Sequence, residues 1–142
     1  GGEKSSPSYV EVSNGLTKHA EVCEIIYDDK KIKLRDLLEI FFLSHDPTTI
    51  NKQGNDIGSH YRSIILYNSI NEKKEIKNYI DNINKEFFSN KIVTELKRFN
   101  QFYKAEEYHQ DYFKNNQSAS YCQLVISPKL MKAKTKLRKY YK

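Results

Sequence analysis

The sequence has no tryptophan, only two cysteines and no apolar run of eighteen residues. Without such a run, no segment can cross a membrane as a helix. Cys23 and Cys122 are too few for a disulfide framework and lack the spacing of metal ligands, so we expect a reducing compartment and no metal. No secretory signal opens the chain, which favours a cytoplasmic location, although the first residue is not Met.

The net charge of +6 comes from one end of the chain. Seven of the 24 basic residues lie between Lys129 and Lys142, which leaves 17 basic against 18 acidic residues in the rest. A protein that grips nucleic acid with its folded surface would spread basic residues through its body. The pattern therefore disfavours a nucleic-acid binder and predicts a solvated basic helix or tail over residues 129–142.

Helical and strand patterns alternate along the chain, which predicts a layered α/β or α+β domain. Three expected strands would make only a thin sheet, and a further strand and helix before Gly1 would complete it. After a loop over residues 1–15, the expected elements are a buried strand over His19–Tyr27, a helix over Leu34–Leu43, a polar loop over Thr48–Gly58, a strand over Arg62–Tyr67, a helix capped by Ser69, a short strand over Val93–Leu96, a short helix near Glu106–Tyr112 and a basic C-terminal helix.

Four polar residues could carry chemistry, and each has an ordinary structural explanation. Glu21 sits in an apolar run, where burial would raise its pKa and keep it a proton donor; otherwise it faces water or pairs with a lysine. Asp56 fits a turn, Tyr61 fits a half-buried strand residue and Tyr9 fits a loop. Cys23, two residues after Glu21, is expected to be a buried structural thiol.

Several segments, in this order, resemble A-type peptide methionine sulfoxide reductases. They cover nearly the whole chain up to about Lys129, and together they are far more specific than any one alone. The segments are Gly1-Gly2, Ser6-Pro7-Ser8-Tyr9, Gly15 to Val22 with its His-Ala-Glu, Ser44-His45-Asp46-Pro47-Thr48, Gln53 to Ser63, and Phe102 to Gln110.

The resemblance implies a fold and a division of the chain. The fold would be an α+β two-layer sandwich, ferredoxin-like, here missing its first strand and helix. Residues 1–128 would form the reductase domain, incomplete at its N-terminus, and residues 129–142 the basic helix or tail. We expect a monomer.

The resemblance also implies roles for individual residues. Glu21 would protonate the sulfoxide oxygen, Tyr61 and Tyr9 would donate hydroxyl hydrogen bonds to it, and Asp56 would orient the network. These roles agree chemically, because attack on sulfur builds negative charge on the departing oxygen. His19 is expected to shape the strand entry rather than to act as a base.

The attacking thiolate of the family belongs to a Gly-Cys-Phe-Trp segment, which these 142 residues do not contain. Cys122 matches the family's resolving cysteine, which converts the sulfenic acid to a disulfide, although the residues after it depart from the commonest family ending. The implied cycle needs no metal or organic cofactor, and thioredoxin or dithiothreitol regenerates the thiols.

The function implied is reduction of methionine-S-sulfoxide, free or in proteins, as repair after oxidative stress. We expect no turnover from this polypeptide alone, since its sequence holds no such nucleophile. The alternative is a non-catalytic remnant that binds methionine sulfoxide or a protein partner.

Overall fold

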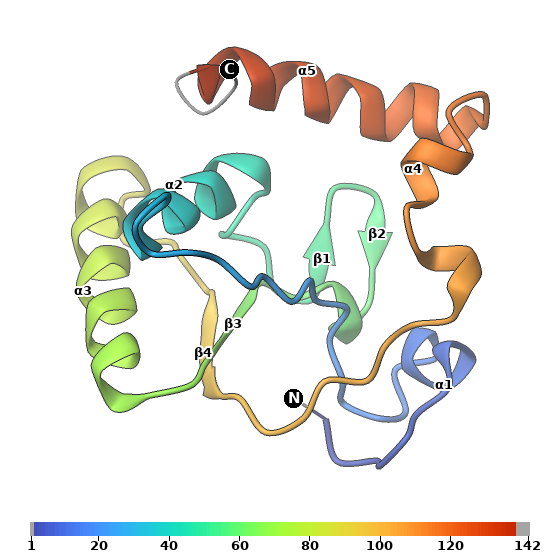
Figure 1. Cartoon of the computed structure of the whole chain (residues 1–142), viewed down its shortest axis with the longest axis horizontal. Helices are drawn as coiled ribbons and strands as arrows, with labels where there is room; N and C mark the ends of the chain where they lie inside the picture. Colours follow the sequence, from blue (N-terminus) through green and yellow to red (C-terminus); the bar gives the residue numbers. More distant parts are fainter. Residues whose placement is uncertain (1, 139–142) are drawn as a thin grey trace. The chain divides into compact units, whose positions relative to one another are not determined.

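A computed structural model describes residues 2–138, which belong to two compact units that divide after Tyr103 (Figure 1). The first unit holds every strand of the described residues, and the second is helical. This mixture of helices and strands agrees with the predicted α+β class, and the strands form two small sheets of two strands each among the described residues. In the described part of the chain, no helix is both long and apolar enough to cross a membrane.

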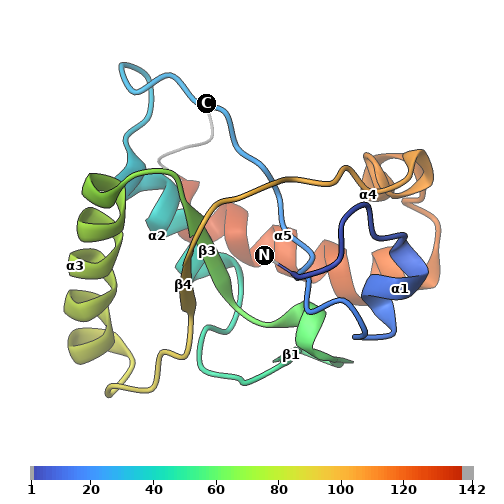
Figure 2. The ribbon, with the colours of Figure 1, turned by 90° about the horizontal axis from the view of Figure 1, so that it is seen from below.

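A strand–helix–strand unit forms the centre of the first unit. Strand β3 (Ile64–Tyr67) pairs in parallel with β4 (Glu95–Arg98), with Ile64 opposite Glu95. Helix α3 (Ile70–Phe87) connects them, because parallel neighbours need a crossover. Figure 2 shows α3 running beside the two strands. Both strands and the helix were predicted, and each strand starts two residues later than expected.

The core lies where two helices cover this pair of strands. Leu38, Tyr67 and Ile76 are its buried centre, and Ile76 has no exposed surface. Leu38 comes from α2 (Leu34–Ser44), which contacts α3. The helical spacing of leucines and phenylalanines predicted α2, and the Asp46-Pro47 pair follows its end.

The cap of α3 also matches its prediction, in part. The Ser69 hydroxyl accepts a hydrogen bond from the Glu72 amide at 3.1 Å, as an N-cap residue does. The Glu72 carboxylate does not return to Ser69; it accepts from the Asn68 amide at 2.7 Å. Both side chains therefore fix the start of the helix. In a capping box Glu72 would bind the Ser69 amide, whereas here it binds the amide one residue earlier.

The predicted strand over His19–Tyr27 is wrong. Residues 18–28 belong to no helix or strand, and Ile25 and Ile26 are 61% and 92% exposed. The backbone hydrogen bond from the Glu21 amide to the His60 carbonyl, 2.9 Å, holds one end of the segment. The apolar pattern suits a strand, but among the described residues no neighbouring strand supplies a ladder along it.

Two local structures lie where only loops were expected. The Thr48–Gly58 loop contains a hairpin of β1 (Lys52–Gln53) and β2 (Asp56–Ile57). The first fifteen residues contain α1 (Tyr9–Ser13), which Ser8 and Glu11 close with a capping box. The serine-rich composition indicated a loop, whereas this Ser-x-x-Glu spacing starts a helix.

The second unit is a chain of short helical turns followed by a longer helix. Its elements are the 3-10 turn η2 (Glu107–His109), α4 (Tyr112–Asn115), the π-helical turn η3 (Cys122–Ile126) and α5 (Ser127–Lys136). Helix α5 covers most of the predicted basic helix. The last four residues of that prediction, 139–142, lie outside the described residues.

Candidate functional site

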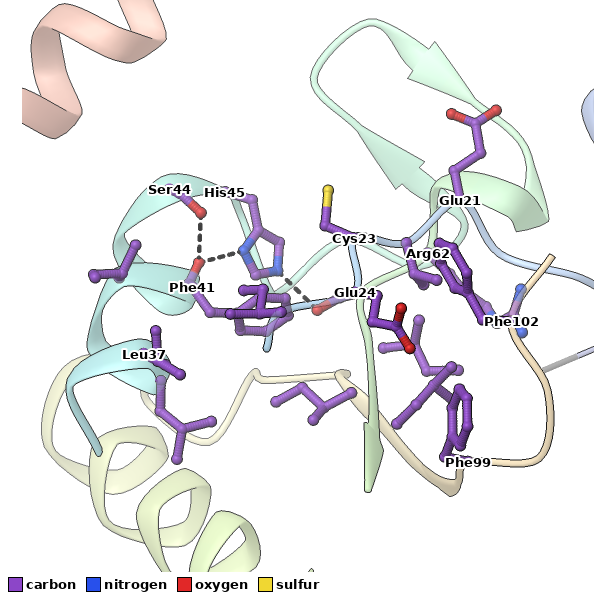
Figure 3. Close-up of a pocket in the computed structure, with 18 of the residues that line it drawn as sticks. Glu21, Cys23, Glu24, Leu37, Phe41, Ser44, His45, Arg62, Phe99 and Phe102 are labelled. Atoms are coloured by element: carbon purple, nitrogen blue, oxygen red, sulfur yellow. Dashed lines mark hydrogen bonds between the residues drawn. The ribbon is translucent and has the colours of Figure 1, made fainter. Parts of the chain in front are cut away.

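A cavity of about 710 Å³ lies in the first unit, between the extended segment at residues 21–27, helix α2 and the start of β3 (Figure 3). Its apolar wall includes Leu37, Phe41, Phe99 and Phe102. Polar residues also line the cavity. They are Glu21, Cys23, Glu24, Tyr27, Ser44, His45, Gln53, His60, Tyr61, Arg62, Ser63, Asn68 and Glu72. An apolar cavity with converging polar groups is the usual form of a small-ligand site.

Two of the predicted site residues, Glu21 and Tyr61, line this cavity together. Tyr9, the first residue of α1, and Asp56, in β2, are not part of its lining. Cys122 is a buried residue of η3 in the second unit. The structure therefore brings together the acid and one of the two phenols.

The surroundings of Glu21 differ from the sequence expectation. The residue is exposed, so the buried carboxyl that the sequence argument needed is not present. Its backbone is fixed, because its amide donates to the His60 carbonyl at 2.9 Å. In Figure 3, Glu21 and Cys23 project to the same side of the segment, and Glu24 projects to the other.

Cys23 is exposed, which overturns the expectation of a buried structural thiol. That expectation followed from the predicted buried strand, and it falls with the strand. The thiol lines the same cavity as Glu21 and Tyr61. A sulfur atom in this position is open to solvent-borne reagents, whereas Cys122 has no exposed surface.

Tyr61 ends a tight 3-10 turn, η1 (Ser59–Tyr61), immediately before β3. Its ring is tilted against the His60 ring, with centroids 4.0 Å apart. Gly58 opens the turn with φ of 153°, and a Cβ at Gly58 would lie 2.4 Å from the His60 ring. Glycine at position 58 therefore lets the imidazole pack on the backbone and sets the place of Tyr61.

His19 has a structural role, although not at the entry of the predicted strand, which is absent from residues 18–28. One ring nitrogen, Nδ1, accepts from the Gly2 amide at 3.1 Å, and Nε2 lies 2.8 Å from the Lys4 carbonyl. A carbonyl only accepts, so Nε2 carries the proton of a neutral ring. With both nitrogens engaged by backbone groups, His19 holds the first residues of the chain against the 17–21 segment.

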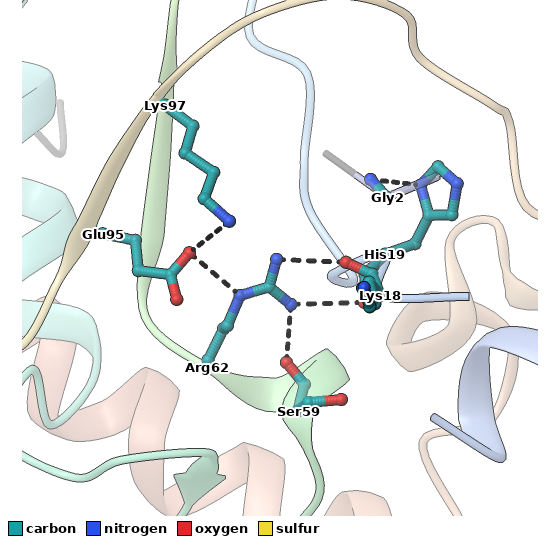
Figure 4. Close-up of polar contacts among 7 residues, drawn as sticks. All are labelled: Gly2, Lys18, His19, Ser59, Arg62, Glu95 and Lys97. Atoms are coloured by element: carbon teal, nitrogen blue, oxygen red, sulfur yellow. Dashed lines mark hydrogen bonds and ion pairs between the residues drawn. The ribbon is translucent and has the colours of Figure 1, made fainter. Parts of the chain in front are cut away.

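Arg62 is a residue whose function the sequence reasoning missed. Its guanidinium donates to the carbonyls of Lys18, His19 and Ser59, and it pairs with the Glu95 carboxylate (Figure 4). Burial alone would raise the pKa of Glu95, but the hydrogen bonds from Lys97 and Arg62 lower it below its ordinary value. The sequence signal was an arginine placed between a polar loop and a buried strand.

His45 anchors a second polar network in the cavity wall. Its Nδ1 donates to the Phe41 carbonyl at 2.7 Å, and its Nε2 lies 2.8 Å from the Ser63 hydroxyl, which in turn lies 2.8 Å from the Thr94 hydroxyl. The neutral ring uses Nδ1 as donor, so Nε2 accepts from Ser63. Burial lowers the pKa of His45 and favours this neutral form, although the Phe41 hydrogen bond opposes the shift.

Comparisons with known sequences point to one family. The sequence model of a family described as peptide methionine sulfoxide reductase matches residues 1–141. A peptide methionine sulfoxide reductase MsrA from Haloquadratum walsbyi is 45% identical over 134 residues, which cover 94% of this chain and 76% of that protein. The MsrA proteins of Saccharolobus solfataricus and Campylobacter jejuni strain RM1221 are 48% and 51% identical, over 93% and 92% of this chain and 74% and 78% of their own lengths.

Comparison with solved structures points to the same family. Mxr1 from Saccharomyces cerevisiae in its reduced form superposes with a TM-score of 0.80 at 39% identity, covering 86% of this chain and 70% of that one. Methionine sulfoxide reductase A of Corynebacterium diphtheriae gives a TM-score of 0.77 at 29% identity, covering 84% of this chain and 61% of that one.

Proposed function

This chain belongs to the peptide methionine sulfoxide reductase family, and we propose that Glu21 and Tyr61 receive the sulfoxide oxygen of the substrate. The family gives the reaction class, an oxidoreductase that acts on methionine sulfoxide. The observation that carries the residue assignment is the shared cavity, which both side chains line.

The chemistry explains why an acid and a phenol are needed there. A thiol attacks the sulfoxide sulfur, and the oxygen then passes to the attacking sulfur as the substrate's sulfur–oxygen bond breaks, which leaves a sulfenic acid on the cysteine and releases the thioether. The sulfoxide is reduced by two electrons, and the attacking thiol is oxidised by two. The oxygen gains negative charge and then a proton during transfer, so donors aimed at it lower the barrier. Glu21 would supply the proton, and the Tyr61 hydroxyl would stabilise the charge.

A second thiol then condenses with the sulfenic acid, which forms a disulfide and releases water. We assign Cys122 to that step, and thioredoxin or dithiothreitol to reduction of the disulfide. Tyr9 and Asp56 stay as predictions for a second hydroxyl donor and an orienting carboxylate. The S-epimer as substrate, free or in proteins, and a monomeric state also belong to this proposal, as does a cycle without metal or organic cofactor.

The finer description of the fold belongs to the same proposal. A two-layer, ferredoxin-like sandwich is supported by the parallel β3–α3–β4 unit and by contact between α2 and α3. A cytoplasmic location is supported by the low cysteine content.

Binding of a small sulfoxide tests the residue assignment without requiring turnover. We expect the S-sulfoxide of N-acetylmethionine amide to shift the NMR signals of Glu21 and Tyr61. Glu21→Gln and Tyr61→Phe should each weaken its binding by about tenfold, the effect of one lost hydrogen bond to a charged or polarised group. Asp29→Asn is the matched control, because Asp29 is exposed a few residues further along the chain and does not line the cavity. Equal losses in all three variants would contradict the assignment.

Turnover is a separate measurement. The 142 residues contain no Gly-Cys-Phe-Trp segment, so we expect no reduction of the sulfoxide by this polypeptide with dithiothreitol. Stereospecific turnover that disappears in Cys23→Ser would instead identify Cys23 as the attacking thiol, and loss in Cys122→Ser would identify Cys122.

A further inference from the structure

The Arg62 side chain joins three separate parts of the first unit. Its Nη1 donates to the Ser59 carbonyl at 2.7 Å and to the His19 carbonyl at 3.3 Å, and its Nη2 donates to the Lys18 carbonyl at 3.2 Å. Its Nε lies 3.2 Å from Glu95 Oε2. One planar cation therefore holds the 18–19 backbone, the η1 turn and the first residue of β4 (Figure 4).

Burial makes these contacts costly to lose. The Arg62 side chain is 10% exposed, whereas Glu95 is 39% exposed and also pairs with Lys97 at 3.0 Å. A buried guanidinium left without acceptors costs several times as much as an exposed one, because it cannot recover its hydrogen bonds from water. The exposed Lys97–Glu95 pair, in contrast, contributes little.

The backbone carbonyls that Arg62 holds lie just before each of the two proposed site residues in the sequence. On one segment, the Lys18 and His19 carbonyls that Arg62 holds come just before Glu21. On the other, the Ser59 carbonyl comes just before His60 and Tyr61. The Glu21 amide closes the same junction by donating to the His60 carbonyl at 2.9 Å. Lys18 adopts the left-handed conformation, with φ of 57°, which a lysine adopts only when its surroundings hold it there.

We propose that Arg62 is a positioning residue, which fixes Glu21 relative to Tyr61 by holding residues 18–19 against the η1 turn. This inference rests on the proposed function for its catalytic meaning. Arg62 acts through the backbone: it lines the cavity, but four of its five N–H groups donate to three carbonyls and to Glu95.

The geometry requires arginine. Four hydrogen bonds leave one guanidinium in three directions, and a lysine ammonium on a single flexible stem cannot reproduce that fork. Arg62→Lys keeps the charge and the pairing with Glu95 but loses the simultaneous hold on both segments. Lys97→Gln is the matched control, because Lys97 binds the same carboxylate and touches neither segment.

Amide hydrogen exchange of the unliganded chain gives the first test. We expect the Glu21 amide to exchange at least about tenfold faster in Arg62→Lys, since its hydrogen bond to His60 loses its support. Amides within α3 should keep their wild-type rates and show that the unit is folded. Lys97→Gln should leave the Glu21 amide unchanged. Glu95→Gln, which keeps Arg62 but weakens its pairing, should give an intermediate rate. An unchanged Glu21 amide in Arg62→Lys would overturn the proposal.

A double-mutant cycle gives the second test and separates positioning from general stability. Arg62→Lys should weaken binding of the S-sulfoxide of N-acetylmethionine amide by about tenfold in the wild-type background and have no further effect in Glu21→Gln. Full additivity of the two substitutions would mean that Arg62 does not act through Glu21, and it would overturn the proposal. If the wild-type chain binds no sulfoxide, the proposed function fails, and the exchange experiment still decides whether Arg62 holds Glu21 in place.

Discussion

Two apolar stretches of similar composition have opposite fates in this protein. Strand β3, Ile-Ile-Leu-Tyr, is paired with β4 and has both ends buried, whereas Val-Cys-Glu-Ile-Ile-Tyr at residues 22–27 pairs with no strand of the described residues and is exposed except for the half-buried Val22. The isoleucine of α3 that packs on β3, Ile76, has no exposed surface, and Ile26 is 92% exposed. Apolar side chains favour a strand, but only a neighbouring backbone and a covering helix make one.

The largest expected change in stability is at Ile76, the buried residue that packs on β3. Ile76→Ala should lower the free energy of unfolding by about 2–5 kcal/mol, because it leaves a cavity among Leu38, Tyr67 and its neighbours. Urea denaturation measures it. Ile70→Ala, at the exposed start of the same helix, is the control and should change stability by less than about 0.5 kcal/mol. Equal costs would show that α3 does not pack as described.

Strand β3 differs from residues 22–27 in its polar contacts as well, because Ser63, directly before β3, is hydrogen-bonded to His45. Substitution of His45 measures how much this contact stabilises the strand. His45→Ala removes an acceptor from the Ser63 hydroxyl and the donor to the Phe41 carbonyl. We expect a loss of about 1–2 kcal/mol in the same denaturation experiment, the net contribution of two hydrogen bonds, because the Phe41 carbonyl still accepts from Ser44 and the Ser63 hydroxyl still meets Thr94. A loss that His45→Gln shares fully would assign the effect to ring packing instead.

The contribution of His45 to stability should also depend on pH. Burial lowers the pKa of His45 in the folded state below its ordinary value of 6.5. The unfolded chain therefore binds the proton first as the pH falls. The His45 contribution is complete above about pH 6.5 and is lost as the pH drops toward the folded pKa. Unfolding curves across this range should lose that component in His45→Gln, which does not titrate.

A smaller effect is expected at the entry to α3. Ser69→Ala removes the cap of the Glu72 amide and should cost about 1 kcal/mol, whereas Ser69→Thr should cost less because threonine also caps. Comparison of the two variants by thermal unfolding separates the cap from the loss of side-chain volume.

The smallest effect belongs to the exposed stretch. Ile26→Ser should change the free energy of unfolding by less than about 0.5 kcal/mol, since the side chain is already in water. A loss as large as that of Ile76→Ala would mean that residues 22–27 are covered in solution, and the contrast between the two stretches would disappear.

Much of the first unit could be predicted from the sequence, because helix periodicity and capping depend on residues close together in the chain. The spacing of Leu34 to Phe42 and the Ser69–Glu72 pair predicted α2 and α3, since helix periodicity and caps act within a few residues. The family followed from several short motifs in order. These features need no knowledge of distant contacts.

The remaining features depend on partners far away in the sequence. The strand expected at His19–Tyr27 failed because a strand needs a neighbour that local pattern does not supply. The Arg62 contacts join residues 43 and 44 positions apart, and Ser63 meets Thr94 across 31 positions. The exposure of Cys23 was missed for the same reason, whereas that of Glu21 agrees with the alternative to burial, a carboxylate that faces water.

The exposed stretch also bears on how copies of this protein behave toward one another. An unpaired, isoleucine-rich backbone is a template on which another extended chain can add. Four carboxylates, Glu21, Glu24, Asp28 and Asp29, and no basic residue lie within residues 20–29. These like charges repel the same stretch of a second copy, so they should disfavour association of two copies along this backbone.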